Sequence, residues 1–266
     1  MSRGQQGWRR FSPRRVSYNT RLLLATLRNT RAGLRFADGL PAETGAPAVV
    51  QGDGSNPFEA YFDSVTEGPG VWKWRHYFPI YERHLSKFID HEVHLVEIGI
   101  YSGGSLPMWR SAFGPGCRVY GVDIDPACLA HEQEGVRVFI GDQADPIFWE
   151  DFVAKVPRID VVIDDGGHQA HQQITSLCCL FPHMAMGGVY IVEDTLSSHH
   201  GFHSFVDGAT RRLSDVYENA PVAPVHQHIA SVHRYPQLTV LEKPGRPVEP
   251  FDSPKHGTVW RPETYI

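Results

Sequence analysis

Two acid-rich segments of the chain contain the residue types best suited to chemistry. In the stretch VVIDDGGHQAHQQ, a run of apolar residues ends in Asp164 and Asp165, and His168 follows after two glycines. A later apolar run ends in the same way, in Glu193 and Asp194. Carboxylates that lie together raise one another's pKa values unless a cation compensates them. If the two segments converge, the four acids indicate a cation site.

A hard divalent ion is the cation that suits these acids best. Asp165, Glu193 and Asp194 offer three oxygen donors, which together with water are suited to Mg²⁺. A metal held there binds a substrate hydroxyl and lowers its pKa. His168 lies three residues after Asp165 and is placed to take the released proton. The alternative is that Asp165 and Asp194 cap helices while His168 packs against its neighbours.

The elements that must position these residues form a regular pattern from residue 94 onward. Short apolar runs alternate with helical or loop segments, which predicts βαβ units and a mostly parallel sheet covered on both faces. The expected strands are HLVEIG (94–99), RVYGVD (118–123), VRVFIG (136–141), IDVVID (159–164) and GVYIVE (188–193). Residues 229–243 are expected to add an antiparallel pair at the sheet edge. Ligands of such sheets bind beyond the carboxyl ends of the strands, where the acids stand.

The loop after the first strand, EIGIYSGGS, bears on the choice of cofactor. Its glycines permit a tight turn, and the N-terminus of the following helix attracts an anion. A dinucleotide fingerprint needs a glycine where Tyr101 stands, so a pyrophosphate is disfavoured. A carboxylate or amino-acid group between Ser102 and Ser105 fits better.

Acidic and amide side chains after the second and third strands extend this site. Asp123 is placed to accept the hydroxyl protons of a ribose, and Asp142 and Gln143 are placed to hydrogen-bond an adenine edge. A helix cap is the alternative for each acid taken alone. Together, a ribose, an adenine and an amino acid without a diphosphate describe S-adenosylmethionine better than NAD.

Composition limits the class of protein. The chain has 266 residues, of which 41% are hydrophobic and 21% charged, as is ordinary for a globular protein. It contains no run of about 18 apolar residues, so no membrane span is expected. Its four cysteines show no C-x-x-C spacing, which favours a reducing, cytoplasmic compartment over a disulfide framework or a zinc site.

Charge is unevenly distributed along the chain. Residues 1–35 contain nine arginines and no acid, and the other 16 basic residues stand against all 30 acids. This acidic remainder argues against nucleic acid as the main ligand. The Arg-rich start is a solvated tail or a helix docked on an acidic face, a transit peptide, or an arm for nucleic acid or membrane. A homo-oligomer would supply the acidic face and is therefore expected.

These patterns divide the chain into four parts. Residues 1–60 form an Arg-rich segment with an amphipathic helix over 17–35 and a linker. Residues 61–92 form an aromatic segment. Its tryptophans either pack against other hydrophobic residues or form an aromatic wall for a sugar or polycyclic ligand. The core takes residues 93–245, and residues 246–266 form an irregular tail.

The motifs EIGIYSGGS, GVDID, IDDGGH and VED, taken together, resemble those of a known family. They are similar to motifs of the metal-dependent sugar O-methyltransferases of macrolide and enediyne antibiotic biosynthesis, of the macrocin, mycinamicin and calicheamicin-rhamnosyl types. The resemblance covers about residues 61–200. It implies the class I methyltransferase fold, an α/β, Rossmann-like, mostly parallel seven-stranded sheet with an antiparallel C-terminal edge strand.

The resemblance also implies cofactors and residue roles. The cofactors are S-adenosyl-L-methionine and Mg²⁺ or a similar divalent cation, with Asp165, Glu193 and Asp194 as metal ligands and His168 as the base. The residues expected at the cofactor are Glu97, Gly99, Tyr101, Ser102, Ser105, Asp123, Asp142, Gln143 and Asp164. Gly167 departs from the serine that many relatives carry, which should affect loop stiffness more than ligation.

The implied function is methylation of a deoxysugar hydroxyl, for example on a rhamnosyl group, of a glycosylated small-molecule natural product. No nucleic-acid or membrane partner is expected. One alternative is an NAD-dependent sugar oxidoreductase, against which Tyr101 argues. Another is a methyltransferase that acts on a β-lactam-type hydroxyl. A third is a non-catalytic binding module whose acids hold a structural ion.

Overall fold

The computed structural model describes residues 13–40, 56–196, 200–216, 221–254 and 256–257. Contacts between residues divide the chain into two units, 1–51 and 52–266, which are described separately. Among the described residues, no helix is long and apolar enough to cross a membrane.

The first unit is described through one helix, α1 (Pro13–Asp38). Proline is well suited to the first turn, where the missing N–H has no partner within the helix. At the other end, the backbone N–H of Gly39 donates to the carbonyls of Arg35 and Phe36. The helix predicted over residues 17–35 is confirmed and is longer at both ends. The linker predicted after it lies mostly outside the described residues.

The second unit is built on a seven-stranded sheet in the order β3-β2-β1-β4-β5-β7-β6. Strands β1 to β5 pair in parallel, and the five predicted strands are confirmed to within two residues. Their bounds are β1 (Val93–Ile98), β2 (Cys117–Asp123), β3 (Val136–Ile140), β4 (Val161–Asp164) and β5 (Val189–Glu193). All six residues of the central strand β1 are buried, as expected for a strand covered on both faces.

The last two strands, β6 (Ser231–Tyr235) and β7 (Leu238–Glu242), form an antiparallel hairpin. Strand β7 also pairs antiparallel with β5, which places its first residue beside Glu193 and its last residue, Glu242, beside Val189. The predicted antiparallel strand is confirmed. It lies one position inside the edge of the sheet, which β6 forms.

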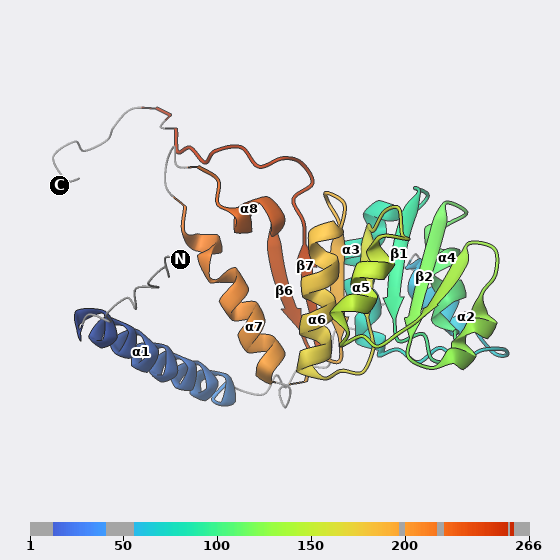
Figure 1. The fold of residues 1–266 in the computed structure, drawn as a ribbon, viewed down its shortest axis with the longest axis horizontal. Helices are drawn as coiled ribbons and strands as arrows, with labels where there is room; N and C mark the ends of the chain where they lie inside the picture. The colour runs from blue at the N-terminus through green and yellow to red at the C-terminus, as the bar shows by residue number, and fades with distance from the viewer. Residues whose placement is uncertain (1–12, 41–55, 197–199, 217–220, 255, 258–266) are drawn as a thin grey trace, which may run out of the picture. The chain divides into compact units, whose positions relative to one another are not determined.

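Helices cover both faces of the sheet (Figure 1). Helices α2, α3 and α4 pack on one face and α5, α6 and α7 on the other. Alternation along β1 explains the two layers, since Val93 and Leu95 contact the first layer and Val96 and Ile98 the second. The helices are α2 (Pro57–Ser64), α3 (Phe78–Leu85), α4 (Ser105–Phe113), α5 (Pro146–Val153), α6 (Ala170–Leu180), α7 (His200–Thr210) and α8 (Pro224–His228). Short 3₁₀ turns are η1 (Arg75–Tyr77), η2 (Ser86–Phe88), η3 (Pro126–His131), η4 (Phe181–His183) and η5 (Arg211–Ser214).

An aromatic cluster packs the segment before β1 against the sheet. Phe58, Tyr81, Trp109 and Phe113 meet with ring centroids 5.3 to 6.4 Å apart, mostly edge to face. Asn56 caps α2, and its Nδ2 donates to the carbonyl of the first residue of α3 at 2.9 Å. The aromatic segment is therefore packed into the second unit, whereas its predicted boundaries stay predictions.

Candidate active site

A cavity of about 870 Å³ opens beyond the carboxyl ends of strands β1 to β5. Its walls are the loops after these strands and residues 70–77, which precede α3. This is the position predicted for a ligand. The predicted site residues that line it are Gly99, Tyr101, Ser102, Ser105, Asp123, Asp142, Gln143, Asp165, His168, Glu193 and Asp194. Glu97 and Asp164 do not line the cavity.

Gly99 lets the loop after β1 cross the loop after β4. Its φ is +82°, and a Cβ built on it would lie 2.2 Å from the carbonyl oxygen of Asp165. Any side chain here would therefore be strained and would also collide with backbone. The two loops are joined further by a 3.0 Å hydrogen bond from the N–H of Asp165 to the carbonyl of Ile98.

Two backbone N–H groups, one from the loop after β1 and one from the loop after β2, fix the position of Asp123. Its Oδ2 accepts the N–H of Tyr101 and its Oδ1 accepts the N–H of Asp125, both at 3.0 Å. Each carboxylate oxygen keeps a second lone pair for a ligand hydroxyl. The side chain of Tyr101, expected to obstruct a pyrophosphate, is 80% exposed at the cavity, and its φ is +44°.

Gln143 lines the cavity, and its side chain also joins two loops. Its Nε2 donates to Asp164 Oδ1 at 2.6 Å, and its Oε1 accepts the N–H of Gly167 at 3.1 Å. Its neighbour Asp142 accepts the N–H of Ala144 at 2.8 Å, as a turn residue does. The predicted adenine contacts of Asp142 and Gln143 stay predictions.

The adjacent carboxylates Asp164 and Asp165 lie in different environments. Asp164 belongs to the face of β4 that packs on α6, where it accepts hydrogen bonds from Ser176 at 2.6 Å and Tyr190 at 3.1 Å. Burial raises the pKa of Asp164, although these donors and Gln143 oppose the shift. Asp165 lines the cavity instead, so the two acids are held apart.

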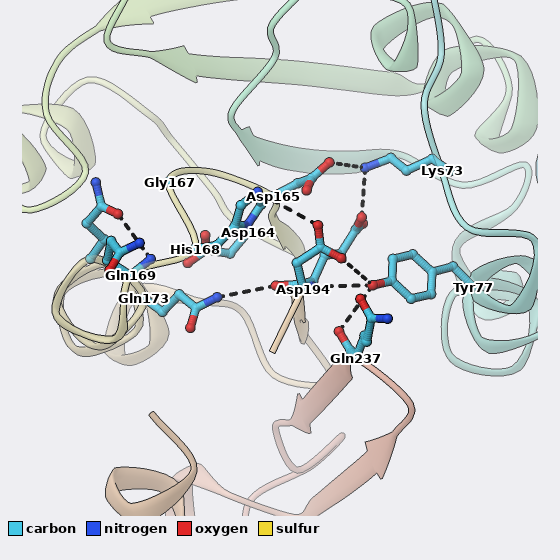
Figure 2. Close-up of polar contacts among 12 residues, drawn as sticks. Lys73, Tyr77, Asp164, Asp165, Gly167, His168, Gln169, Gln173, Asp194 and Gln237 are labelled. Atoms are coloured by element: carbon cyan, nitrogen blue, oxygen red, sulfur yellow. Dashed lines mark hydrogen bonds and ion pairs between the residues drawn. The ribbon is translucent and has the colours of Figure 1, made fainter. Parts of the chain in front are cut away.

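Lys73 lies among the cavity acids (Figure 2). Its Nζ is 2.7 Å from Asp165 Oδ2, 2.9 Å from Glu193 Oε2 and 3.9 Å from Glu97 Oε1. Burial disfavours the ammonium, but the three carboxylates outweigh burial and hold the pKa of Lys73 above its ordinary value. The ammonium is therefore a counter-ion built into the site, and sequence reasoning missed it.

Tyrosines of the same segment donate to the acids that end β5. Tyr81 OH donates to Glu193 Oε1 at 2.6 Å, and Tyr77 OH donates to Asp194 Oδ1 at 2.8 Å. Burial raises the pKa of Glu193, while Lys73 opposes the shift. Both oxygens of Glu193 thus have donors within the chain.

Glu97 is completely buried at the end of β1, on the side of the sheet that faces Lys73. Burial raises its pKa, and the ammonium of Lys73 opposes the shift. Among the described residues, neither carboxylate oxygen has a partner with full hydrogen-bond geometry, although the side chains of Trp109 and Ser105 lie near enough to lower its pKa. Buried carboxylates usually have such partners, so Glu97 depends on the ammonium of Lys73, 3.9 Å away, for compensation of its charge.

His168 and Asp194 meet at the cavity wall. Their Nε2 and Oδ2 atoms are 3.8 Å apart, and their φ angles are +56° and +51°. Left-handed backbone at such residues costs on the order of 1–3 kcal/mol and clusters at functional sites. The Nδ1 of His168 is buried without a hydrogen-bond partner among the described residues.

Donor atoms of Asp165, His168 and Asp194 lie within 4.8 Å of one another, close enough to ligate a single ion. The carboxylates of Asp165 and Asp194 offer the oxygen ligands that Mg²⁺ prefers, which leaves the imidazole of His168 free of the ion. Of the three predicted metal ligands, Asp165 and Asp194 belong to this cluster, whereas Glu193 is bound by Lys73 and Tyr81. The site therefore fits a divalent cation, while the ligand role of each residue stays a prediction.

Comparison with known proteins agrees with this arrangement. Residues 96–195 match the protein family described as a methyltransferase domain. Residues 96–195 are a methyltransferase domain. This matched range includes the glycine loop, the acids at the ends of the parallel strands and His168, and thus every residue of the predicted site.

Curated relatives of this methyltransferase domain are named as O-methyltransferases, and the name of one of them includes a rhamnosyl group. The 8-demethyl-8-alpha-L-rhamnosyl tetracenomycin-C 2'-O-methyltransferase of Streptomyces olivaceus is 34% identical over 203 residues, or 68% of this chain and 53% of that protein. The mycinamicin VI 2''-O-methyltransferase of Micromonospora griseorubida is 31% identical over 230 residues, or 77% of this chain and 57% of that protein. The chain spans about half the length of these relatives.

A solved structure resembles the fold that holds the methyltransferase domain. The MycE methyltransferase from the mycinamycin biosynthetic pathway, in complex with Mg and SAH, matches with a TM-score of 0.57 and 27% identity. The match covers 88% of this chain and 61% of that one. The same methyltransferase has also been solved with Mg, SAH and mycinamycin VI. These matches confirm the predicted family resemblance and the class I methyltransferase fold.

Proposed function

We propose that the chain is an S-adenosylmethionine- and Mg²⁺-dependent O-methyltransferase that acts on a deoxysugar hydroxyl of a glycosylated small molecule. The observation that carries the proposal is the convergence of Asp165, His168 and Asp194 on the cavity that the glycine loop borders. The names of the relatives support the sugar acceptor, and the Mg and SAH bound to MycE support the cofactors.

Residues at the carboxyl ends of β1 to β3 would hold the cofactor. Gly99 lets the loop turn tightly, Asp123 would face the ribose, and Asp142 and Gln143 would lie near the adenine, since all four line the cavity. Asp165 and Asp194 would hold the metal, with Glu193 fixed behind them by Lys73 and Tyr81. When bound, S-adenosylmethionine supplies an electrophilic methyl group and Mg²⁺ supplies a Lewis acid.

His168 would act as the general base. Its Nε2 would take the proton of the acceptor hydroxyl as that oxygen receives the methyl group that the cofactor supplies. Asp194, 3.8 Å away, stabilises the imidazolium that forms. The left-handed backbone at both residues fixes the pair against the cavity, so less reorganisation is needed during the reaction.

The exposed aromatic side chains around the cavity are suited to a glycoside acceptor. Trp72 and Trp74 line the cavity and are 91% and 53% exposed. Exposed aromatic rings offer an apolar face to a sugar ring or an aglycone. The homo-oligomer and the cytoplasmic location expected from the sequence stay predictions, and light scattering tests the first.

A methyl-transfer assay tests the proposal. The protein is incubated with S-adenosylmethionine and Mg²⁺ and with pairs of rhamnosylated polyketides and their aglycones, and products are read by mass spectrometry. The proposal predicts the mass gain of one methyl group on a glycoside but not on its aglycone. Methylation of aglycones, or binding of SAH without transfer to any glycoside, would contradict the sugar acceptor.

A further inference from the structure

A second cluster of possible metal ligands lies at the opposite end of the sheet from the cavity. It consists of His84 from the last turn of α3, His233 from β6 and Glu242 from the end of β7. Glu242 pairs with Val189 at the start of β5, whereas the cavity acids follow the end of β5. None of these residues lines the cavity.

The donor atoms of this cluster converge. His84 Nδ1 is 3.0 Å from Glu242 Oε1, and His233 Nε2 is 3.5 Å from Glu242 Oε2. One donor atom from each residue lies within 4.8 Å of the other two. A tetrahedral zinc ion with bonds of about 2.1 Å separates its ligand atoms by about 3.4 Å. Small side-chain adjustments would therefore bring the three donors onto one ion.

Hydrogen bonds around the cluster orient its donors. His84 Nε2 lies 2.9 Å from Tyr235 OH, which leaves Nδ1 as the nitrogen that faces Glu242. Ser231 Oγ donates to Glu242 Oε2 at 2.7 Å. Metal-ligating histidines commonly donate their second ring N–H to such a partner, and ligating carboxylates are themselves hydrogen-bonded.

The cluster is also accessible from solvent. The side chains of His233 and Glu242 are 30% and 24% exposed, whereas that of His84 is 3% exposed. An ion can therefore reach the cluster and keep a water molecule as its fourth ligand. A set of two imidazoles and one carboxylate suits zinc or a similar transition metal better than Mg²⁺, which prefers oxygen ligands and water.

We propose that His84, His233 and Glu242 form a second divalent-metal site, for Zn²⁺ or a similar ion, that fastens α3 to the β6–β7 hairpin. The segment that continues into α3 carries Lys73, and its tyrosines contact the cavity acids. An ion at the far end of α3 would hold that segment in place. The site is structural, and the inference does not rest on the proposed methyl transfer.

Thermal unfolding with Zn²⁺ tests the site. The full chain is stripped with EDTA, dialysed into excess Mg²⁺, and melted with and without Zn²⁺ in wild type, His233→Gln and a control, His228→Gln. His228 is exposed on α8 and lies outside the cluster. Zn²⁺ at about 100 times its Kd should raise the Tm of wild type and His228→Gln by roughly 5–10 °C, and that of His233→Gln by far less.

Two further measurements identify the ion's location. The Zn²⁺ shift should persist in Asp194→Asn, which removes a ligand of the cavity site. Co²⁺ should give the intense visible absorption of a tetrahedral site in wild type, and this signal should be lost in His233→Gln. No shift in wild type, an equal shift in His233→Gln, or a shift lost only in Asp194→Asn would each overturn the proposal.

Discussion

Two charged clusters lie at opposite ends of strands β5 and β7, and they differ in their ratio of acidic to basic groups. Near the carboxyl end of β5, the single ammonium of Lys73 lies within ion-pair distance of three carboxyl groups. Near the start of β5, the single carboxylate of Glu242 lies within ion-pair distance of two histidines. In the first cluster, burial raises the pKa values of Glu193 and Glu97, so a second cation bound there would favour their ionised forms. The second is already satisfied by hydrogen bonds, so an ion would stabilise it further.

This difference separates a site for chemistry from a site for stability. The acidic cluster is also bordered by residues with left-handed backbone, His168 and Asp194. The residues of the histidine cluster belong to a regular helix and two regular strands. We expect changes in the first to affect catalysis and ligand binding, and changes in the second to affect stability alone.

Removal of the proposed base should have the largest effect. His168→Ala is expected to lower turnover by about 10²- to 10⁴-fold and to leave SAH affinity nearly unchanged, because the imidazole moves a proton and does not bind the cofactor. Turnover with a glycoside acceptor and calorimetric titration with SAH measure the two effects. His171→Ala, an exposed position three residues later, is the matched control. Wild-type turnover in His168→Ala would remove the assignment.

Loss of the built-in cation should have the next largest effect. Lys73→Met leaves two buried acids, Glu193 and Glu97, and the partly buried Asp165 without their ammonium, which should destabilise the protein by about 3–5 kcal/mol in EDTA. Urea unfolding measures this loss, and Lys155→Met, at an exposed position, is the control. Added Mg²⁺ should restore more stability to Lys73→Met than to wild type. A loss below about 1 kcal/mol would mean that the carboxylates do not depend on Lys73.

A pair of tyrosine variants compares the two clusters directly. Tyr81→Phe removes the donor to buried Glu193, which should cost about 1.5–3 kcal/mol because the acceptor is charged. Tyr235→Phe removes a bond to a neutral histidine, which should cost about 0.5–1.5 kcal/mol. Urea unfolding of both variants in EDTA gives the difference. Equal losses would argue that the two clusters do not differ in charge.

Acid stability should show the smallest effect. The pKa of Glu242 is about 2 in the folded protein, below its ordinary value of 4.5. Its contribution to stability is therefore present above pH 4.5 and is lost as the pH falls toward 2. In EDTA, Glu242→Gln should reduce the slope of stability against pH across this window. Unchanged slopes between the variant and wild type would contradict this role.

The sequence predicted the strands well because their physical signal is local. Runs such as VVID and VYIVE are apolar on both faces and end in acids, so their bounds follow from a few residues. From the sequence, Asp164 and Asp165 were expected at the same site. The alternation of side chains along β4 explains why the structure separates them. Asp164 shares the face of Val162, which packs toward α6, and therefore does not line the cavity.

Lys73 and the tyrosines of its segment could not be placed in this way. Lys73 meets Asp165 across 92 residues of sequence, and Tyr81 meets Glu193 across 112. Such contacts depend on the packing of α3 on the sheet, which the local pattern does not determine. The one available signal was a lysine between two tryptophans in a stretch rich in aromatic residues.

The central claim is that the cavity at the ends of β1 to β5 binds an adenosyl cofactor without a diphosphate. The most direct test is calorimetric titration of the protein with SAH and, separately, with NAD, each in Mg²⁺ and in EDTA. We expect micromolar binding of SAH and no binding of NAD. Binding of NAD, or of neither compound, would contradict the interpretation that the glycine loop and the acids around it hold an adenosyl cofactor without a diphosphate.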